Sequence, residues 1–134
     1  NTNDDLDILV QEIVVPNTPT SERLSMNELE ILSQNGELIE RFEIGQTGML
    51  FSKVKNAIDF SQEFTYIVQI KNEDNNVISL SWVTGETMPS QELGMSVSWM
   101  PQEPGKYSIE RFVWNSIQGA IPLTETISTE ILIQ

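Results

Sequence analysis

The 134-residue sequence contains no histidine and no cysteine, and its aspartates and glutamates outnumber its lysines and arginines by 20 to seven. The absence of histidine removes the commonest general base, the usual zinc or copper ligand and any Ser-His-Asp triad. The absence of cysteine removes disulfides, thiol nucleophiles and thiolate metal sites. A blue-copper β-sandwich is therefore excluded on ligand grounds. We expect a protein that is not an enzyme and holds no cofactor.

Basic residues are too few and too scattered to form a surface for nucleic acid. The net charge of −13 at pH 7 disfavours phosphate backbones and anionic lipid alike. No apolar run approaches the ~20 residues that a membrane-spanning helix needs. The sequence begins at Asn1 rather than at methionine, which is typical of a processed chain whose signal peptide is gone, although a chosen boundary looks the same. We expect no nucleic-acid partner and no membrane span.

Strand signals recur along the chain, whereas helix signals are weak. Alternation of apolar and polar residues predicts strands at 28–33, 37–44, 47–54, 63–71, 77–84, 94–100, 106–115 and 126–133. Turn residues separate them, as in QNG at 34–36 and PQEPG at 101–105. Strands about ten residues apart with turns between them are typical of an antiparallel β-sandwich. We predict an all-β chain in which 24–134 form one sandwich domain and 1–23 form an N-terminal strand and linker.

Several predicted strands have a readable inward face. We expect the core to receive one alternating set from each of three strands: Phe64, Tyr66, Val68, Ile70, Ile78, Leu80, Trp82, Tyr107, Ile109 and Val113. Arg111 falls on the same face as Tyr107, where a sandwich prefers an apolar residue. Its guanidinium is expected either to reach the rim along its aliphatic stem or to pair with a carboxylate.

The stretch EPGKYSIERFVW (103–114) is typical of an immunoglobulin-like corner. A Pro-Gly turn leads into a strand that starts near a tyrosine, and the tyrosine hydroxyl can reach back to nearby backbone. We predict this structural role for Tyr107. The sandwich is therefore expected to be immunoglobulin-like.

Two longer stretches carry a family resemblance. FTYIVQIKNEDNNVISLSWVTGE and SVSWMPQEPGKYSIERFVWNS resemble an Ig-like module of secreted and cell-surface proteins of ammonia-oxidising archaea. The most specific shared run is S-W-x-P-x-x-P-G-x-Y, and the resemblance covers about residues 30–134. It implies an extracellular Ig-like sandwich and brings no catalytic residues with it. The sequence departs from the pattern at Arg111, where an aliphatic residue is typical, and in its acidic start.

The three tryptophans could form a platform for sugars, because exposed aromatic rings stack on sugar rings. Trp82 lies on a predicted core face and Trp99 adjoins a proline turn, so we expect both to pack inside or at a corner. Phe112 and Trp114 are the better candidates for an exposed interface patch, and we expect such a patch to contact protein rather than glycan. The acidic stretches at 1–5 and 72–76 offer oxygen ligands for calcium without EF-hand spacing, and we expect no metal site.

The N-terminal segment LDILVQEIVV is too apolar to stay in water comfortably. Read as a strand, it alternates and then breaks phase at Gln11-Glu12, where a bulge keeps both apolar groups on one face. That face comprises Leu6, Ile8, Val10, Ile13 and Val15. An amphipathic helix is the alternative, although β-branched residues and the stop at Pro16 disfavour it, and disorder is a third.

The linker PNTPTSER (16–23) is extended by its prolines and can carry this segment to another subunit. A neighbour's strand can fill the groove and the open edges of an incomplete sandwich, and a contact of that kind that does not close into a ring builds a filament. The organisation is similar to that of secreted archaeal and bacterial pilins. We therefore expect a homopolymeric, extracellular filament subunit. The alternative is a monomeric secreted or cell-surface Ig-like binding or adhesion module, in which the segment completes its own sandwich.

Overall fold

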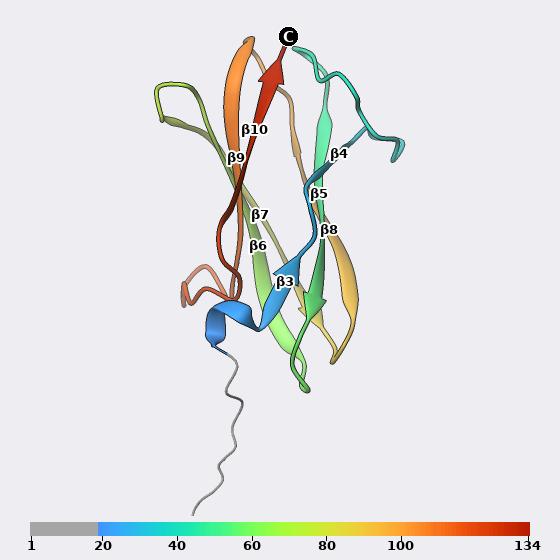
Figure 1. The fold of residues 1–134 in the computed structure, drawn as a ribbon, viewed down its shortest axis with the longest axis vertical. Coiled ribbons are helices and arrows are strands. Elements are labelled where there is room, and N and C mark those ends of the chain that lie inside the picture. Colours follow the sequence, from blue (N-terminus) through green and yellow to red (C-terminus); the bar gives the residue numbers. More distant parts are fainter. Residues whose placement is uncertain (1–18) are drawn as a thin grey trace, which may run out of the picture.

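The computed structural model describes residues 19–134, and these form eight strands after one 3-10 turn (Figure 1). The turn η1 is Thr20–Glu22. The strands are β3 Leu24–Met26, β4 Glu30–Leu32, β5 Gly48–Asn56, β6 Gln62–Lys71, β7 Val77–Thr87, β8 Glu92–Trp99, β9 Gly105–Trp114 and β10 Ile127–Ile133. Among the described residues, no helix is long and apolar enough to cross a membrane.

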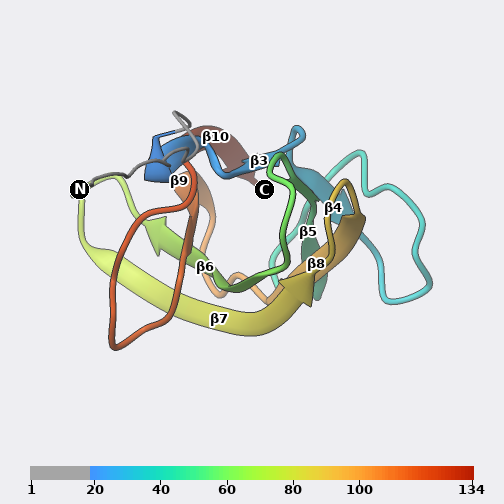
Figure 2. The same cartoon turned by 90° about the horizontal axis from the view of Figure 1, so that it is seen from below.

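The strands form two antiparallel sheets that face each other. One sheet has the order β10-β9-β6-β7, and the other is centred on β5. β3 and β4 pair with successive parts of β5, at 54–56 and 49–51, and β8 pairs with β5 over 48–55. β3 and β4 therefore share one edge of β5. Seen from below, β3 and β10 lie beside each other at one side of the sandwich, and β7 and β8 close the other side (Figure 2).

The core lies between the two sheets. The predicted inward face of β6 is confirmed, because Phe64, Tyr66, Val68 and Ile70 are all buried. Tyr107, Ile109 and Val113 of β9 are buried with them, as predicted. The second sheet and the loops complete the cluster with Leu24, Phe42, Leu50, Val54, Met95, Val97 and Leu123.

The prediction for the inward face of β7 is wrong. Cross-strand partners point to the same side of a sheet, and Tyr66 pairs with Val83 while Ile67 pairs with Trp82. Trp82 therefore points outward with Ile78 and Leu80, and all three side chains are exposed. The inner face of β7 carries small residues because space is short there: a Cβ on Gly85 would lie 3.0 Å from the Phe64 ring.

The predicted strand at 37–44 is also absent. This stretch is a loop that follows the turn at Gly36, whose φ of 87° favours glycine. A single bridge between Leu32 and Leu38 ties the start of the loop to β4. The buried ring of Phe42 anchors the loop, and Ile39 packs against the core, whereas Leu38 and Ile44 are exposed. The sequence prediction also missed the short β3, whereas the other predicted strands are confirmed with small shifts in their ends.

Candidate functional site

Tyr107 makes the predicted corner. Its hydroxyl donates a hydrogen bond of 2.7 Å to the backbone carbonyl of Glu103, four residues upstream. Trp99 packs edge-on against the Tyr107 ring, with centroids 5.2 Å apart, and against Phe42 at 5.7 Å. The corner role predicted for Tyr107 and the packing role predicted for Trp99 are both confirmed.

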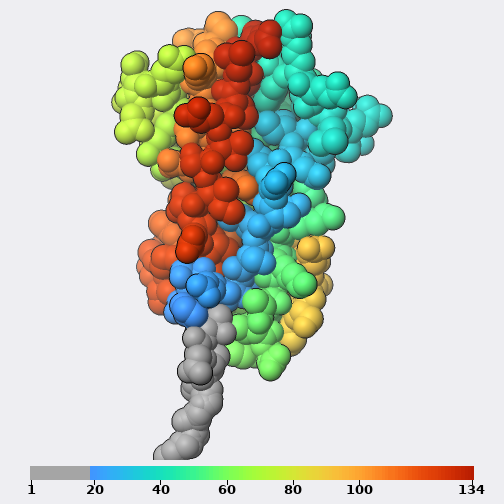
Figure 3. Space-filling view, in the orientation of Figure 1, coloured from blue at the N-terminus to red at the C-terminus, as the bar shows by residue number. Residues whose placement is uncertain are grey.

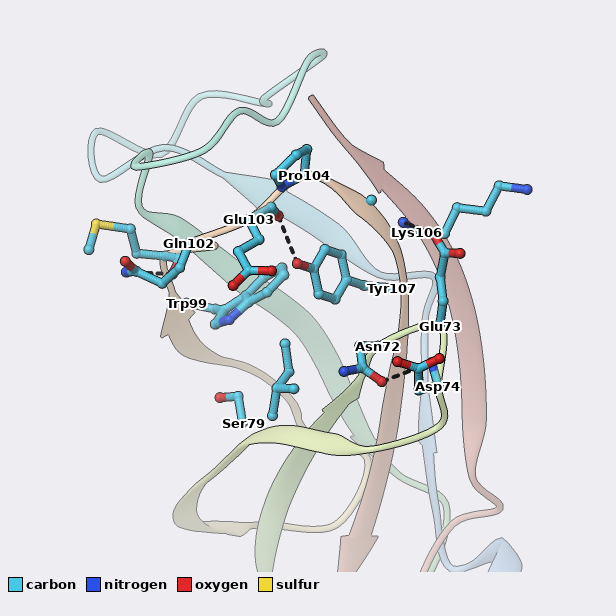
Figure 4. A pocket seen from close by; sticks show the side chains of 13 residues that line it. Asn72, Glu73, Asp74, Ser79, Trp99, Gln102, Glu103, Pro104, Lys106 and Tyr107 are labelled. Atoms are coloured by element: carbon cyan, nitrogen blue, oxygen red, sulfur yellow. Dashed lines mark hydrogen bonds between the residues drawn. The ribbon is translucent and has the colours of Figure 1, made fainter.

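A cavity of about 650 Å³ opens beside this corner, between the β6–β7 and β8–β9 loops. Figure 4 shows the rings of Trp99 and Tyr107 on one side, with Asn72, Glu73 and Asp74 approaching from the other. The polar side chains on the second side already accept hydrogen bonds from the backbone of the loops. Glu73 accepts from the backbone N–H of Lys106 at 3.0 Å, and Asn72 Oδ1 accepts from the N–H groups of residues 74 and 76. The cavity offers a surface for binding and no nucleophile paired with a base.

The surroundings of this cavity change the pKa of the Tyr107 hydroxyl. Burial raises the pKa of the Tyr107 hydroxyl from its ordinary value of 10.0, and the carboxylates of Glu103 and Glu73 raise it further because they disfavour a second negative charge. Tyr107 is therefore a neutral hydrogen-bond donor at physiological pH. Within 19–134, no three His, Cys, Asp or Glu residues gather closely enough to hold a metal ion.

The outer face of the β10-β9-β6-β7 sheet carries an apolar patch. Trp82, Ile67 and Phe112 form one row across β7, β6 and β9, because Ile67 is the register partner of both. Ile67 is only 2% exposed although it points outward, whereas Trp82 is 52% exposed. Trp114 lies beside Phe112, with ring centroids 5.2 Å apart. We call Ile67, Leu80, Trp82, Phe112 and Trp114 the outer apolar face.

The predicted patch residues Phe112 and Trp114 thus lie together on the outer side of β9, each half-buried. The sequence prediction missed Trp82 as their neighbour. Its alternation was visible, but two apolar sets compete along β7, and only the pairing with β6 shows which set faces out. The face has a polar border at one end, where Gln69 donates to Glu110 at 2.7 Å and Lys71 lies 3.5 Å from the same carboxylate.

Arg111 is buried, with 1% of its surface exposed, so its guanidinium does not reach the rim. Nη1 donates to the Asn27 carbonyl at 2.9 Å and to Ser52 Oγ at 2.6 Å, and Ser52 Oγ is 2.8 Å from the Tyr66 hydroxyl. No carboxylate lies within 4.0 Å of it among residues 19–134, and its Nε has no hydrogen-bond partner there. Burial lowers the pKa of Arg111 from its ordinary value, and the Tyr66 hydroxyl opposes that shift.

Arg111 helps to line a cleft of about 300 Å³ between β10 and the short segment 27–29 that joins β3 to β4. We call it the β3–β10 cleft. Met26, Leu29 and Ile127 give it apolar sides, and Thr129 and Glu28 add polar groups. In the space-filling view the red atoms of β10 run beside the blue atoms of the N-terminal strands (Figure 3). Because β10 ends its sheet, its outer backbone edge has no strand partner within the described part of the chain.

The five residues predicted to form an inserting strand, Leu6, Ile8, Val10, Ile13 and Val15, lie outside the described residues. Their role stays a prediction, as does the boundary of the N-terminal segment at residue 23.

Comparisons with solved structures identify the fold. The C-terminal domain of wzt matches with a TM-score of 0.69 at 11% identity, over 84% of this chain and 74% of that one. A CARDB domain from Pyrococcus furiosus, solved in complex with di-metal ions, matches with a TM-score of 0.58 at 16% identity, over 87% and 97% of the two chains. The fold is an Ig-like β-sandwich. A Bacteroides uniformis β-glucuronidase matches with a TM-score of 0.63 at 12% identity over 78% of this chain, which is only 13% of the enzyme.

No protein-family model matches the chain, and no curated protein matches it. At these identities the structural likeness establishes the fold alone. An Ig-like β-sandwich is compatible with a binding or adhesion module, and the predicted fold class is confirmed.

Proposed function

We propose that this protein is a structural subunit of an extracellular, pilus-like filament, in which the N-terminal strand of one subunit inserts beside β10 of the next. The observation that carries the proposal is the β3–β10 cleft. The inward-facing residues of β10 are only half-buried for most of its length, from Ile127 to Ile131, and Ile133 alone is buried. A completed sandwich buries these positions, so this side of the domain has room for another strand.

An added strand would pair with the free edge of β10 and fill the apolar cleft beside it. The free edge of β10 presents backbone N–H and C=O groups that pair readily with an incoming strand. The cleft beside it offers apolar walls from Met26, Leu29 and Ile127. The sequence supplies a matching strand in residues 6–15, with alternating apolar side chains and a proline-containing linker behind it. The contact joins different surfaces of two subunits, so repetition generates a filament.

An extracellular location fits the same proposal. The resemblance to Ig-like modules of secreted archaeal proteins supports it, as does a net charge of −13, which keeps a subunit soluble before assembly. The proposal assigns the chain no catalytic activity and takes identical subunits as its partners.

Electron microscopy of two chains tests the proposal. The full-length chain is expected to form filaments at high concentration, whereas a chain lacking residues 1–15 is expected to stay folded and monomeric. Circular dichroism of the truncated chain serves as the control for folding. Filaments from the truncated chain, or a full-length chain that never assembles, contradict the proposal.

A second candidate is a monomeric binding or adhesion module that uses the outer apolar face. The observation that favours it is the exposed row of Trp82 and Phe112 over Ile67, because aromatic residues of this kind are enriched at protein interfaces. Under this candidate the full-length chain stays monomeric. Beads coated with it adhere to cell surfaces, and Trp82→Thr abolishes adhesion; adhesion that survives this substitution contradicts the candidate.

A further inference from the structure

The guanidinium of Arg111 is a buried positive charge without a counter-ion among residues 19–134. A charge in such a place costs several kcal/mol of desolvation unless it is paired and its hydrogen bonds are made. Two of its bonds go to neutral oxygens, those of Asn27 and Ser52, and its Nε has none. Arginine is the residue best suited to bind a carboxylate through two parallel hydrogen bonds.

The place of this charge connects it with the cleft. Arg111 lies on β9 opposite Ile127, at the start of β10, and helps to line the β3–β10 cleft together with Thr129. Met26, Leu29 and Ile127 surround it with apolar side chains. A matching occupant therefore has mostly apolar side chains and one acidic side chain that pairs with Arg111. Glu28 also lines the cleft but forms no ion pair with Arg111. The residues 19–134 therefore supply no carboxylate to Arg111, and an occupant of the cleft could supply one.

We propose that Arg111 binds the carboxylate of Glu12 from the N-terminal strand of a second copy of this chain, and so fixes the register of the inserted strand. The inference rests on the proposed assembly. The sequence of 1–18 has the required pattern, because Glu12 lies between the apolar residues Val10 and Ile13 at the phase break. Alternation that starts at Leu6 and runs through Val10 reaches Glu12, so Glu12 falls on the apolar side of the strand. A bulge that sets Glu12 and Ile13 against one partner residue then keeps Ile13 on that same side.

A role for Glu12 in fixing the pairing register of the inserted strand explains why an acidic residue interrupts the apolar alternation. A strand with period-2 alternation alone can slip by two residues and still present its apolar face. A single buried ion pair penalises every slipped register, because the slipped strand leaves Arg111 without a partner and buries an apolar residue against it. The other acids of the segment, such as Asp7, lie outside the phase break and are expected to face solvent.

A double-mutant cycle in the full-length chain tests the pairing. Glu12→Gln is expected to weaken assembly, measured as the critical concentration by light scattering, by at least about tenfold, because it leaves the cation buried and unpaired. In the Arg111→Met background the same substitution is expected to have no weakening effect. Equal losses in both backgrounds overturn the proposal.

The matched control is Asp7→Asn, which removes the same charge from the same segment. Subunits of net charge −13 repel one another, so a general electrostatic effect predicts that both substitutions strengthen assembly. A loss with Glu12→Gln and none with Asp7→Asn supports the specific pair, whereas equal effects of the two overturn it. If the chain lacking residues 1–15 fails to assemble but Glu12→Gln assembles normally, the strand insertion stands and the pairing with Arg111 fails.

The absence of cysteine allows a direct check of position and source. Chains carrying Val10→Cys, on the apolar side of the strand, are mixed with chains carrying Thr129→Cys, and disulfide-linked dimers of the two are expected after oxidation. Ser128→Cys, on the opposite face of β10, serves as the control and is expected to link poorly. A doubly substituted chain that links only within itself overturns the assignment to a second copy.

Discussion

Ser52 on β5 and Arg111 on β9 join the two sheets through a bond of 2.6 Å between Oγ and Nη1. The bond lies in the core, and the Tyr66 hydroxyl extends it to a third strand. A charge in this place differs from the aliphatic residue that the family resemblance leads one to expect. Under the proposed assembly, this charge serves to bind the inserted strand of a second copy.

The first prediction concerns the free energy of unfolding of the Arg111→Met variant. Methionine fills similar space without a buried charge, and Ser52 keeps its bond to Tyr66, so we expect stability within about 1 kcal/mol of the parent chain or above it. Arg111→Ala leaves a cavity and is expected to unfold about 2 kcal/mol or more below the methionine variant. Urea unfolding measures both. A methionine variant as unstable as the alanine variant would show that the cation itself stabilises the domain.

The second prediction distinguishes two tryptophans. Trp99 packs against Phe42 and Tyr107, so Trp99→Ala is expected to cost about 3–5 kcal/mol of stability. Trp82 is half exposed on the outer apolar face, and Trp82→Thr, which keeps a good strand former, is expected to cost less than about 1 kcal/mol. Thermal and urea unfolding of the two variants provide the comparison. Similar losses for both would place Trp82 in the core.

The case of Trp82 also shows what the sequence allows and what it leaves open. The strand positions of β5, β6, β9 and β10 follow from alternation and turn residues, and the corner at Tyr107 follows from a local Pro-Gly-x-Tyr pattern. The sequence does not show which set of β7 side chains faces the core, because both of its alternating sets contain apolar residues. The choice is made by its neighbour β6, whose large inward side chains leave room for only small ones opposite.

The candidate surfaces were harder to predict than the fold. Phe112 and Trp114 could be assigned to one face from alternation within β9. The role of Arg111 depends on Asn27 and Ser52, which are 84 and 59 residues away in the sequence. No local pattern carries such a contact. The alternation of Leu38, Phe42 and Ile44 predicts a strand at 37–44. In the structure only Phe42 of these three is buried, and it anchors a loop.

The third prediction concerns the hydrogen bond at the corner. Tyr107→Phe removes the donor to the Glu103 carbonyl and keeps the ring against Trp99. We expect a loss of about 0.5–1.5 kcal/mol in the free energy of unfolding, the usual value for one intramolecular bond. Urea unfolding at neutral pH measures it, and a variant as stable as the parent would mean that the bond does not hold the corner.

The fourth prediction concerns stability at alkaline pH. The sequence has two tyrosines, and burial raises the pKa of both Tyr66 and Tyr107 above 10.0. Above pH 10.0 the unfolded chain therefore loses tyrosine protons before the folded chain does, so the stability that these groups contribute is complete below 10.0 and falls as the pH rises towards their folded values. Ultraviolet absorbance of tyrosinate is expected to rise at a higher pH in the folded protein than in urea. Coincident titrations would contradict the burial of both hydroxyls.

The most direct measurement of the central claim is the molar mass of the full-length chain by light scattering, across a wide range of concentration, beside that of the chain lacking residues 1–15. Insertion of the N-terminal strand beside β10 predicts that the mass of the full-length chain grows with concentration, while the truncated chain keeps the mass of a monomer. A full-length chain that remains monomeric at every concentration, or a truncated chain that grows in the same way, would contradict the account.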